Sequence, residues 1–72
     1  IHLDEDIYKG KVKISNLNLP SDTTITMITR NGKILAPTGK TYIYSGDTIS
    51  ILAKNSKVKD ITEKILINFN SI

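Results

Sequence analysis

Apolar and polar residues alternate through the middle of the chain, from residue 23 to residue 53. Alternation with a period of two places successive side chains on opposite faces of a β-strand. It predicts four strands, over residues 23–30, 33–36, 41–44 and 48–53. The first is rich in β-branched residues and carries Ile25 and Met27 at one parity and Ile28 at the other. We therefore expect apolar side chains on both faces of this strand.

Three turn signals separate these strands. Asn31-Gly32 is the strongest of them, because both central positions of a type I′ turn need a positive φ. Residues 37–40 and 45–47 are rich in proline, glycine and aspartate, and they predict two further turns. Since a short turn joins each strand to the next, an antiparallel meander is the expected arrangement.

The apolar pattern changes to a helical period after residue 56. Four apolar residues recur at positions i, i+3, i+7 and i+8, namely Val58, Ile61, Ile65 and Leu66. This spacing makes one stripe and predicts a helix over residues 57–67, with Ser56 as its N-cap. Residues 68–72 are expected to form a polar tail that contains two apolar residues.

The first twenty residues are less regular. Residues 1–3 predict a short strand, and residues 11–17 a short helix that ends before Pro20, because proline disfavours helical backbone in the preceding residue. Together these elements predict an α+β fold, a small antiparallel sheet of about four strands with a C-terminal helix packed on it. One domain is expected to span residues 1–72.

The small size of the chain bears on how it is stabilised. A domain of about this length buries only about 60% of the surface that its unfolded chain exposes. The sequence has no cysteine and one histidine, His2, which excludes disulfides and a zinc site built from such ligands. Self-association is therefore the expected source of additional stability.

The net charge of +3 comes from nine lysines and one arginine that are spread along the chain. A nucleic-acid-binding surface is usually a dense basic stripe with aromatic residues, and here only Tyr42 and Tyr44 lie close together. Nucleic-acid binding is not expected. The chain also has neither a signal peptide nor an apolar run of about 20 residues, so we expect a soluble domain, which a membrane protein can also carry.

Gly39-Lys40-Thr41 resembles the end of a phosphate-binding P-loop. The full motif needs a glycine five residues earlier and a helix afterwards, but that position is Ile34 and a strand is predicted to follow. A turn with a solvated lysine is the favoured interpretation.

Asp4-Glu5-Asp6 is the one acidic cluster, and three carboxylates could bind a hard cation such as calcium. The ligand spacing and the turning glycine of a calcium loop are missing, so a solvated acidic loop is favoured, with a cation at a subunit contact as the alternative. The chain has no cysteine nucleophile, and its single histidine lies beside the first residue. We expect no enzymatic activity and no cofactor.

Arg30 is the only arginine and directly precedes the Asn31-Gly32 turn. A guanidinium fork suits phosphate oxygens, whereas the alternative is an exposed charge at a turn. A short apolar ridge follows, and it is expected to form core, dimer contact or ligand pocket: Ile34, Leu35, Ala36 and Pro37.

Several short motifs occur together and in register along most of the chain: Leu19-Pro20, Ile28-Thr29-Arg30-Asn31-Gly32, Pro37-Thr38-Gly39-Lys40-Thr41 and Gly46-Asp47. In this series the chain resembles the RCK C-terminal, or TrkA-C, family from residue 8 to residue 66. The resemblance implies a cytoplasmic regulatory domain of a bacterial potassium channel, potassium transport complex or cation/proton antiporter, usually dimeric and attached to a membrane transport protein.

Some members of that family are similar to receptors for cyclic di-AMP, which they hold between two copies. The resemblance implies Arg30 and Asn31 as phosphate contacts. It implies four further residues as adenine contacts: Ile34, Leu35, Ala36 and Pro37. The nucleotide-binding lobe that accompanies this domain in the family is absent from these residues, so NAD or ATP binding is not implied. Two alternatives stay open, a purely structural dimerisation module and the effector domain of a transcription regulator.

Overall fold

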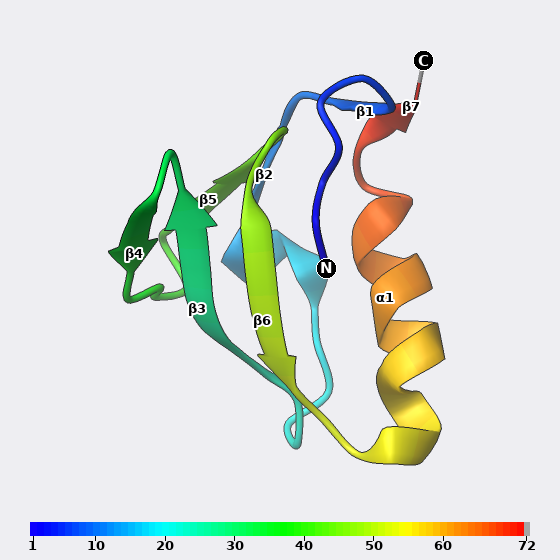
Figure 1. Ribbon diagram of the computed structural model, residues 1–72. Coiled ribbons are helices and arrows are strands. Elements are labelled where there is room, and N and C mark those ends of the chain that lie inside the picture. Colours follow the sequence, from blue (N-terminus) through cyan, green and yellow to red (C-terminus); the bar gives the residue numbers. More distant parts are fainter. Residues whose placement is uncertain (72) are drawn as a thin grey trace.

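The computed structural model describes residues 1–71 and confirms an α+β fold (Figure 1). The elements in chain order are β1 (Tyr8–Lys9), β2 (Lys11–Lys13), the 3₁₀-helix η1 (Ile14–Leu17), β3 (Thr24–Arg30), β4 (Lys33–Leu35), β5 (Tyr42–Tyr44), β6 (Thr48–Leu52), the 3₁₀-helix η2 (Asn55–Lys57), α1 (Val58–Leu66) and β7 (Asn70–Ser71). Each of the four strands expected in the middle of the chain is present, with ends that differ from the prediction by one residue or less.

The expected meander is wrong. All strand pairs are antiparallel, but they form a three-stranded sheet in the order β4-β3-β6 and two ribbons, β2-β5 and β1-β7. Strand β5 lies between β4 and β6 in the sequence but is not part of their sheet. It pairs with β2, about thirty residues earlier in the chain. Strands that are neighbours in sequence pair often but not always. A turn signal shows where the chain reverses, but it does not specify which strand the next segment pairs with.

An irregularity in β3 changes which residues face the core. The pairing of β3 with β6 shifts by one residue between Ile25 and Met27, as at a β-bulge. One extra residue reverses the alternation of faces. Ile25 and Ile28 therefore both point into the core and are buried, whereas Met27 lies on the opposite face. The expectation that Ile25 and Ile28 face opposite sides is wrong for this reason.

The opening of the chain differs from its prediction. Residues 11–17 form strand β2 and then η1 instead of one helix, and Leu17 at the end of η1 is buried. Pairing of β2 with β5 outweighs the local helical pattern. In place of a strand over residues 1–3, His2 makes one isolated bridge with Thr48.

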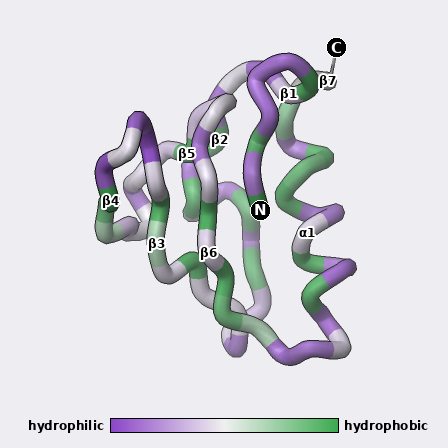
Figure 2. The backbone as a smooth tube through the Cα atoms, viewed as in Figure 1, coloured by the Kyte–Doolittle hydropathy of each residue, from purple (hydrophilic) through white to green (hydrophobic). Residues whose placement is uncertain are grey.

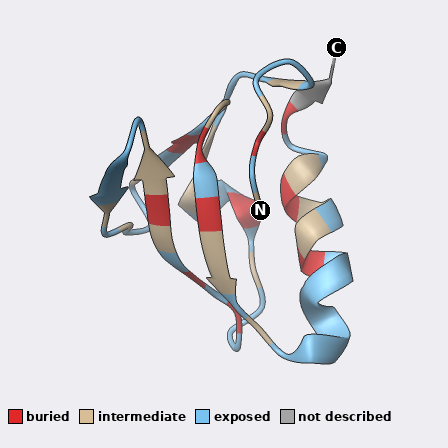
Figure 3. Cartoon of the chain, in the orientation of Figure 1, coloured by how far each residue is buried: buried red, intermediate tan, exposed pale blue. Residues whose placement is uncertain are grey.

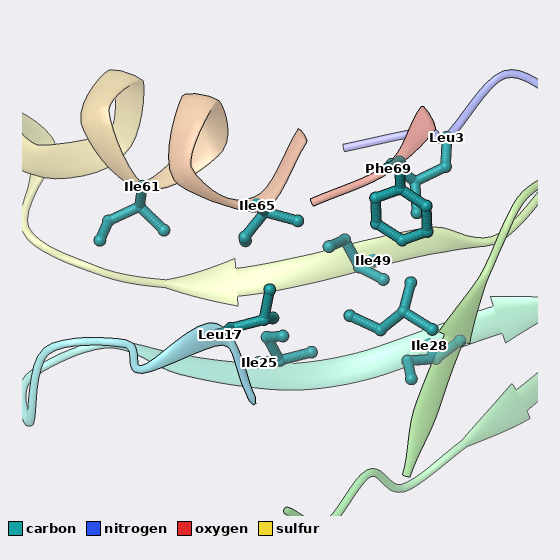
Figure 4. Packing of buried hydrophobic residues seen from close by; sticks show 9 residues of the cluster. Leu3, Leu17, Ile25, Ile28, Ile49, Ile61, Ile65 and Phe69 are labelled. Atoms are coloured by element: carbon teal, nitrogen blue, oxygen red, sulfur yellow. The ribbon is translucent and has the colours of Figure 1, made fainter. Parts of the chain in front are cut away.

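Helix α1 covers one side of the core (Figure 1), and apolar and polar residues alternate along it (Figure 2). Ile61 and Ile65 of its apolar stripe point toward β6 (Figure 4). Ile61 and Ile65 are buried and Leu66 is partly buried, whereas Val58 at the first turn is exposed (Figure 3). The N-cap is Lys57, with no side-chain capping bond, so the prediction of Ser56 as N-cap is wrong. Ser56 is instead the middle residue of the preceding 3₁₀-helix η2.

The core joins the sheet, η1, the helix and both ends of the described chain. Its buried members are Leu3, Leu17, Ile25, Ile28, Ile43, Ile49, Ile61, Ile65 and Phe69, most of them shown in Figure 4. The prediction of a polar tail is wrong at Phe69, because the ring of this residue is buried and the following strand β7 pairs with β1. Ile72, the other apolar residue of that tail, lies outside the described residues.

Candidate functional site

The hairpin between β3 and β4 has the turn that its sequence predicts. Asn31 has a φ of 52° and Gly32 a φ of 78°, so both central positions lie in the left-handed region that a type I′ turn needs. Both residues are exposed. The turn fixes the register in which Arg30 faces Lys33 and Thr29 faces Ile34.

Arg30, the predicted phosphate contact, is held by groups of the protein. Its Nε donates to Oδ1 of Asp47 at 2.9 Å, and its Nη2 donates to Oδ2 of the same carboxylate at 2.8 Å. Nη2 also donates to the backbone oxygen of Tyr42 at 3.0 Å. The guanidinium lies 4.6 Å from the centre of the Tyr44 ring. This bidentate pair and the aromatic contact fix the guanidinium over the β5–β6 turn.

Electrostatics around Arg30 favour its charged form. The hydrogen bonds to Asp47 and the negative charge of that carboxylate raise the pKa of Arg30 above its ordinary value, against a smaller opposing effect of burial. The Arg30 side chain is 30% exposed, whereas that of Asp47 is 2% exposed. The Arg30 cation is therefore partly accessible to solvent, and the buried Asp47 carboxylate already balances its charge.

The structure divides the predicted ligand residues between two faces of the sheet. Residues directly opposite each other in an antiparallel pair share a face. Leu35 faces Ile28 and packs against the core, whereas Ile34 faces Thr29 and is 71% exposed. Arg30 lies at the same parity as Ile28, so it points to the face of Leu35 and away from the face of Ile34.

Ala36 and Pro37 follow the end of β4. Ala36 is exposed, and Pro37 is half-buried at the edge of a hollow of about 380 Å³. Three segments surround this hollow: η1 together with the residues after it, the first residues of β3, and the turn before β5. Its lining includes Ile14, Leu19, Thr23, Ile25 and Gly39. Neither Arg30 nor Asn31 lines it. The six predicted residues thus follow one hairpin but do not converge on one pocket.

The face of the three-stranded sheet opposite the core is uncharged, which the sequence reasoning missed. We call it the outer sheet face, and its members are Thr24, Met27, Thr29, Ile34, Thr48, Ser50 and Leu52. None of the seven is buried, and none is Lys, Arg, Asp or Glu. In the sequence, this face is indicated by the lack of charge at Met27, Thr29, Thr48 and Ser50. Assigning these four residues to one face requires knowledge of the bulge in β3.

The Gly39-Lys40-Thr41 segment and the Asp4-Glu5-Asp6 cluster both lie at turns. Thr38 and Thr41 close a turn, in which the Thr38 backbone N–H donates to the Thr41 hydroxyl at 2.9 Å, and strand β5 follows. Asp4 accepts a hydrogen bond from the Asp6 backbone N–H at 2.9 Å, in the turn before β1. Among residues 1–71, no group of three or more His, Cys, Asp or Glu side chains is placed to hold a metal ion.

The fold is a small α+β domain, in which a three-stranded sheet and two ribbons share a core with helix α1. Comparison with protein families identifies it, because the family model described as TrkA-C domain matches residues 8–66. This match includes every element from β1 to α1, and the chain belongs to the TrkA-C domain family. The family is one of regulatory, non-catalytic domains associated with potassium transport.

No curated protein matches the chain. In the described part of the structure, no helix is both long enough and apolar enough to cross a membrane.

Proposed function

We propose that this domain is the cytoplasmic regulatory domain of a potassium or other cation transport protein, working as a homodimer that senses cyclic di-AMP. Membership of the TrkA-C domain family supports the regulatory role. In this proposal the ligand favours one relative placement of the two copies, and that placement biases the attached membrane protein. A ligand shifts such an equilibrium only by its difference in affinity for the two placements.

The observation that carries the homodimer is the uncharged outer sheet face. It presents Ile34, Met27 and Leu52 among threonine and serine side chains, without a charge that would have to be desolvated on contact. Depletion of charged residues is typical of the core of a protein interface. A two-fold dimer brings the same patch from both copies together, so no complementary surface elsewhere is needed.

The ligand fits this arrangement by its symmetry. Cyclic di-AMP has two phosphates and two adenines, and each copy of the dimer would offer one set of the same residues. On each copy Ile34 and Ala36 supply exposed apolar surface, Pro37 lies beside them, and the exposed Asn31 amide lies at the turn. Arg30 points to the other face of the sheet, so it would add positive charge near the hairpin end without sharing the face of Ile34, and its guanidinium is fixed by Asp47.

Calorimetric titration of the purified domain with cyclic di-AMP tests the proposal, with cyclic di-GMP as the control nucleotide. One cyclic di-AMP per dimer and weaker binding of cyclic di-GMP are expected. Ile34→Ser should weaken binding about tenfold, which corresponds to about 1.4 kcal/mol. Ile67→Ser is the matched control, because Ile67 is an exposed isoleucine at the end of α1. Sedimentation of the same variants separates a lost ligand contact from a lost dimer.

The second candidate is a structural dimerisation module that binds no nucleotide. The engagement of Arg30 by Asp47 favours it, because the only arginine of the chain already has an anionic partner. A dimer that binds neither cyclic di-AMP nor cyclic di-GMP would support this candidate and reject the sensor.

A further inference from the structure

Two tyrosines and two lysines share the outward face of the β2-β5 ribbon. In this ribbon Lys11 lies opposite Tyr44, and Lys13 lies opposite Tyr42. The alternate pair, Val12 and Ile43, points the other way, with Ile43 fully buried in the core. We call these four outward residues, Lys11, Lys13, Tyr42 and Tyr44, the tyrosine–lysine face.

Three side chains of this face, Lys11, Tyr42 and Tyr44, make aromatic contacts, one of them with Arg30. The Lys11 ammonium lies 5.0 Å from the centre of the Tyr42 ring, and the Arg30 guanidinium lies 4.6 Å from that of Tyr44. The two rings are 6.3 Å apart and tilted by 39°, and each tyrosine is 39% exposed. Cation–π contacts of this kind hold a long lysine side chain in place, which lowers the entropy lost when it binds a partner.

Neither lysine of the face forms an ion pair within the described part of the chain. Two ion pairs occur there, Arg30 with Asp47 and Lys54 with Asp22, and neither includes Lys11 or Lys13. Two residues apart on a strand, these lysines are spaced by about 6.6 Å, which is twice the rise per residue. Acidic side chains two residues apart on an extended partner have the same spacing and would also lie on one side of it.

We propose that the tyrosine–lysine face is a docking surface for an extended acidic segment of another protein, with Asp or Glu at every second position. Its carboxylates pair with Lys11 and Lys13, and the phenol hydroxyls of Tyr42 and Tyr44 donate hydrogen bonds to them. None of the four residues of the tyrosine–lysine face belongs to the outer sheet face or to the β3–β4 hairpin, and this surface meets the proposed nucleotide site at Arg30, whose guanidinium lies over the Tyr44 ring.

The geometry favours an acidic segment over single-stranded nucleic acid. Nucleic-acid binding needs open ring faces for stacking bases and a basic groove that follows the phosphates. Here Lys11 and Arg30 each lie over one of the two rings, and the rings are tilted to each other instead of forming a platform. Two unpaired lysines match two carboxylates better than a run of phosphates.

Fluorescence anisotropy with labelled peptides tests the proposal on the intact chain. The first probe is a peptide of alternating glutamate and threonine, and the second has the same composition with its glutamates in one block. An oligothymidylate of equal charge is the third. Lys11→Glu with Lys13→Glu should weaken binding of the alternating peptide by about tenfold or more, because two favourable charge contacts become repulsive.

The matched control is Lys57→Glu with Lys59→Glu, which makes the same change of net charge at the exposed start of α1. This control should change binding by less than about threefold, since distant exposed charges are largely screened by salt. Circular dichroism verifies that both double variants fold. Equal binding of the alternating and block peptides, equal losses in the two double variants, or tighter binding of the oligothymidylate would each overturn the proposal.

Discussion

The Arg30 guanidinium and the Asp47 carboxylate form a two-point ion pair that joins β3 to the turn between β5 and β6. The same carboxylate accepts the Tyr44 backbone N–H at 2.9 Å, so both of its oxygens have partners although Asp47 is buried. The backbone oxygen of Asp47 accepts the Leu3 N–H at 2.8 Å. One residue thus connects the hairpin that carries the proposed nucleotide site with the first residues of the chain.

This pair predicts that Arg30→Ala destabilises the fold. Removing the guanidinium leaves the buried Asp47 charge with the Tyr44 N–H as its remaining donor. We expect the free energy of unfolding to fall by about 2–3 kcal/mol, somewhat below the loss for a fully buried pair, because Arg30 is partly exposed. Urea unfolding of the variant measures this loss.

A double-mutant cycle with Asp47→Asn gives the control for that prediction. Once the carboxylate is an amide, removing Arg30 no longer leaves a buried charge. Arg30→Ala should then cost less in the Asp47→Asn background than in the natural chain. Equal costs in both backgrounds would show that the pair does not stabilise the fold.

Gly32→Val should destabilise the domain more than Gly39→Val. Gly32 has a positive φ at which a β-branched side chain is strained, at a cost of about 1–2 kcal/mol. A Cβ at Gly39 would meet the Ser15 Cβ at 3.8 Å, an ordinary van der Waals contact. Thermal melts compare the two variants. Gly32→Asn serves as control and should melt closer to the natural chain, because asparagine tolerates a positive φ.

Ile34→Lys should convert the proposed dimer into a monomer, because the two-fold axis would bring two new charges into the uncharged outer sheet face. The matched control is Ile67→Lys, the same change at an exposed isoleucine of the C-terminal end of α1. Sedimentation at about 100 µM, where weak interfaces still associate, should show a dimer for the natural chain and for Ile67→Lys. A monomeric natural chain would reject the dimer, and a monomeric control would place its interface elsewhere.

Phe69→Ala should cost about 3 kcal/mol or more of unfolding free energy, since a buried phenylalanine leaves a cavity when it is truncated. Phe69 belongs to the main core, together with Leu3 and Ile65. Phe69→Leu keeps most of the apolar volume and should cost much less. A melting temperature of Phe69→Ala equal to that of the natural chain would contradict the burial of this ring.

The elements of the hairpin followed from local pattern. Alternation over residues 23–36 and the Asn31-Gly32 turn predicted β3, β4 and the type I′ geometry, because turn type depends on the φ that a few adjacent residues tolerate. The same holds for α1, whose stripe of Ile61 and Ile65 is visible in the spacing alone. Family membership also followed from short motifs, which mark the turns.

Interactions between distant residues decided the rest. Residues 11–17 have a helical pattern on their own, but pairing with Tyr42–Tyr44 makes the first of them a strand. The bulge between Ile25 and Met27 depends on the match with β6, and it sets which side of the sheet is uncharged. No local preference of Arg30 specifies Asp47, seventeen residues away, as its partner. The sequence by itself determined strands β3 to β6, helix α1, the turns between these strands and the family. The tertiary structure alone decided strand order, the faces of the sheet and the engagement of Arg30, because these depend on which distant segments meet.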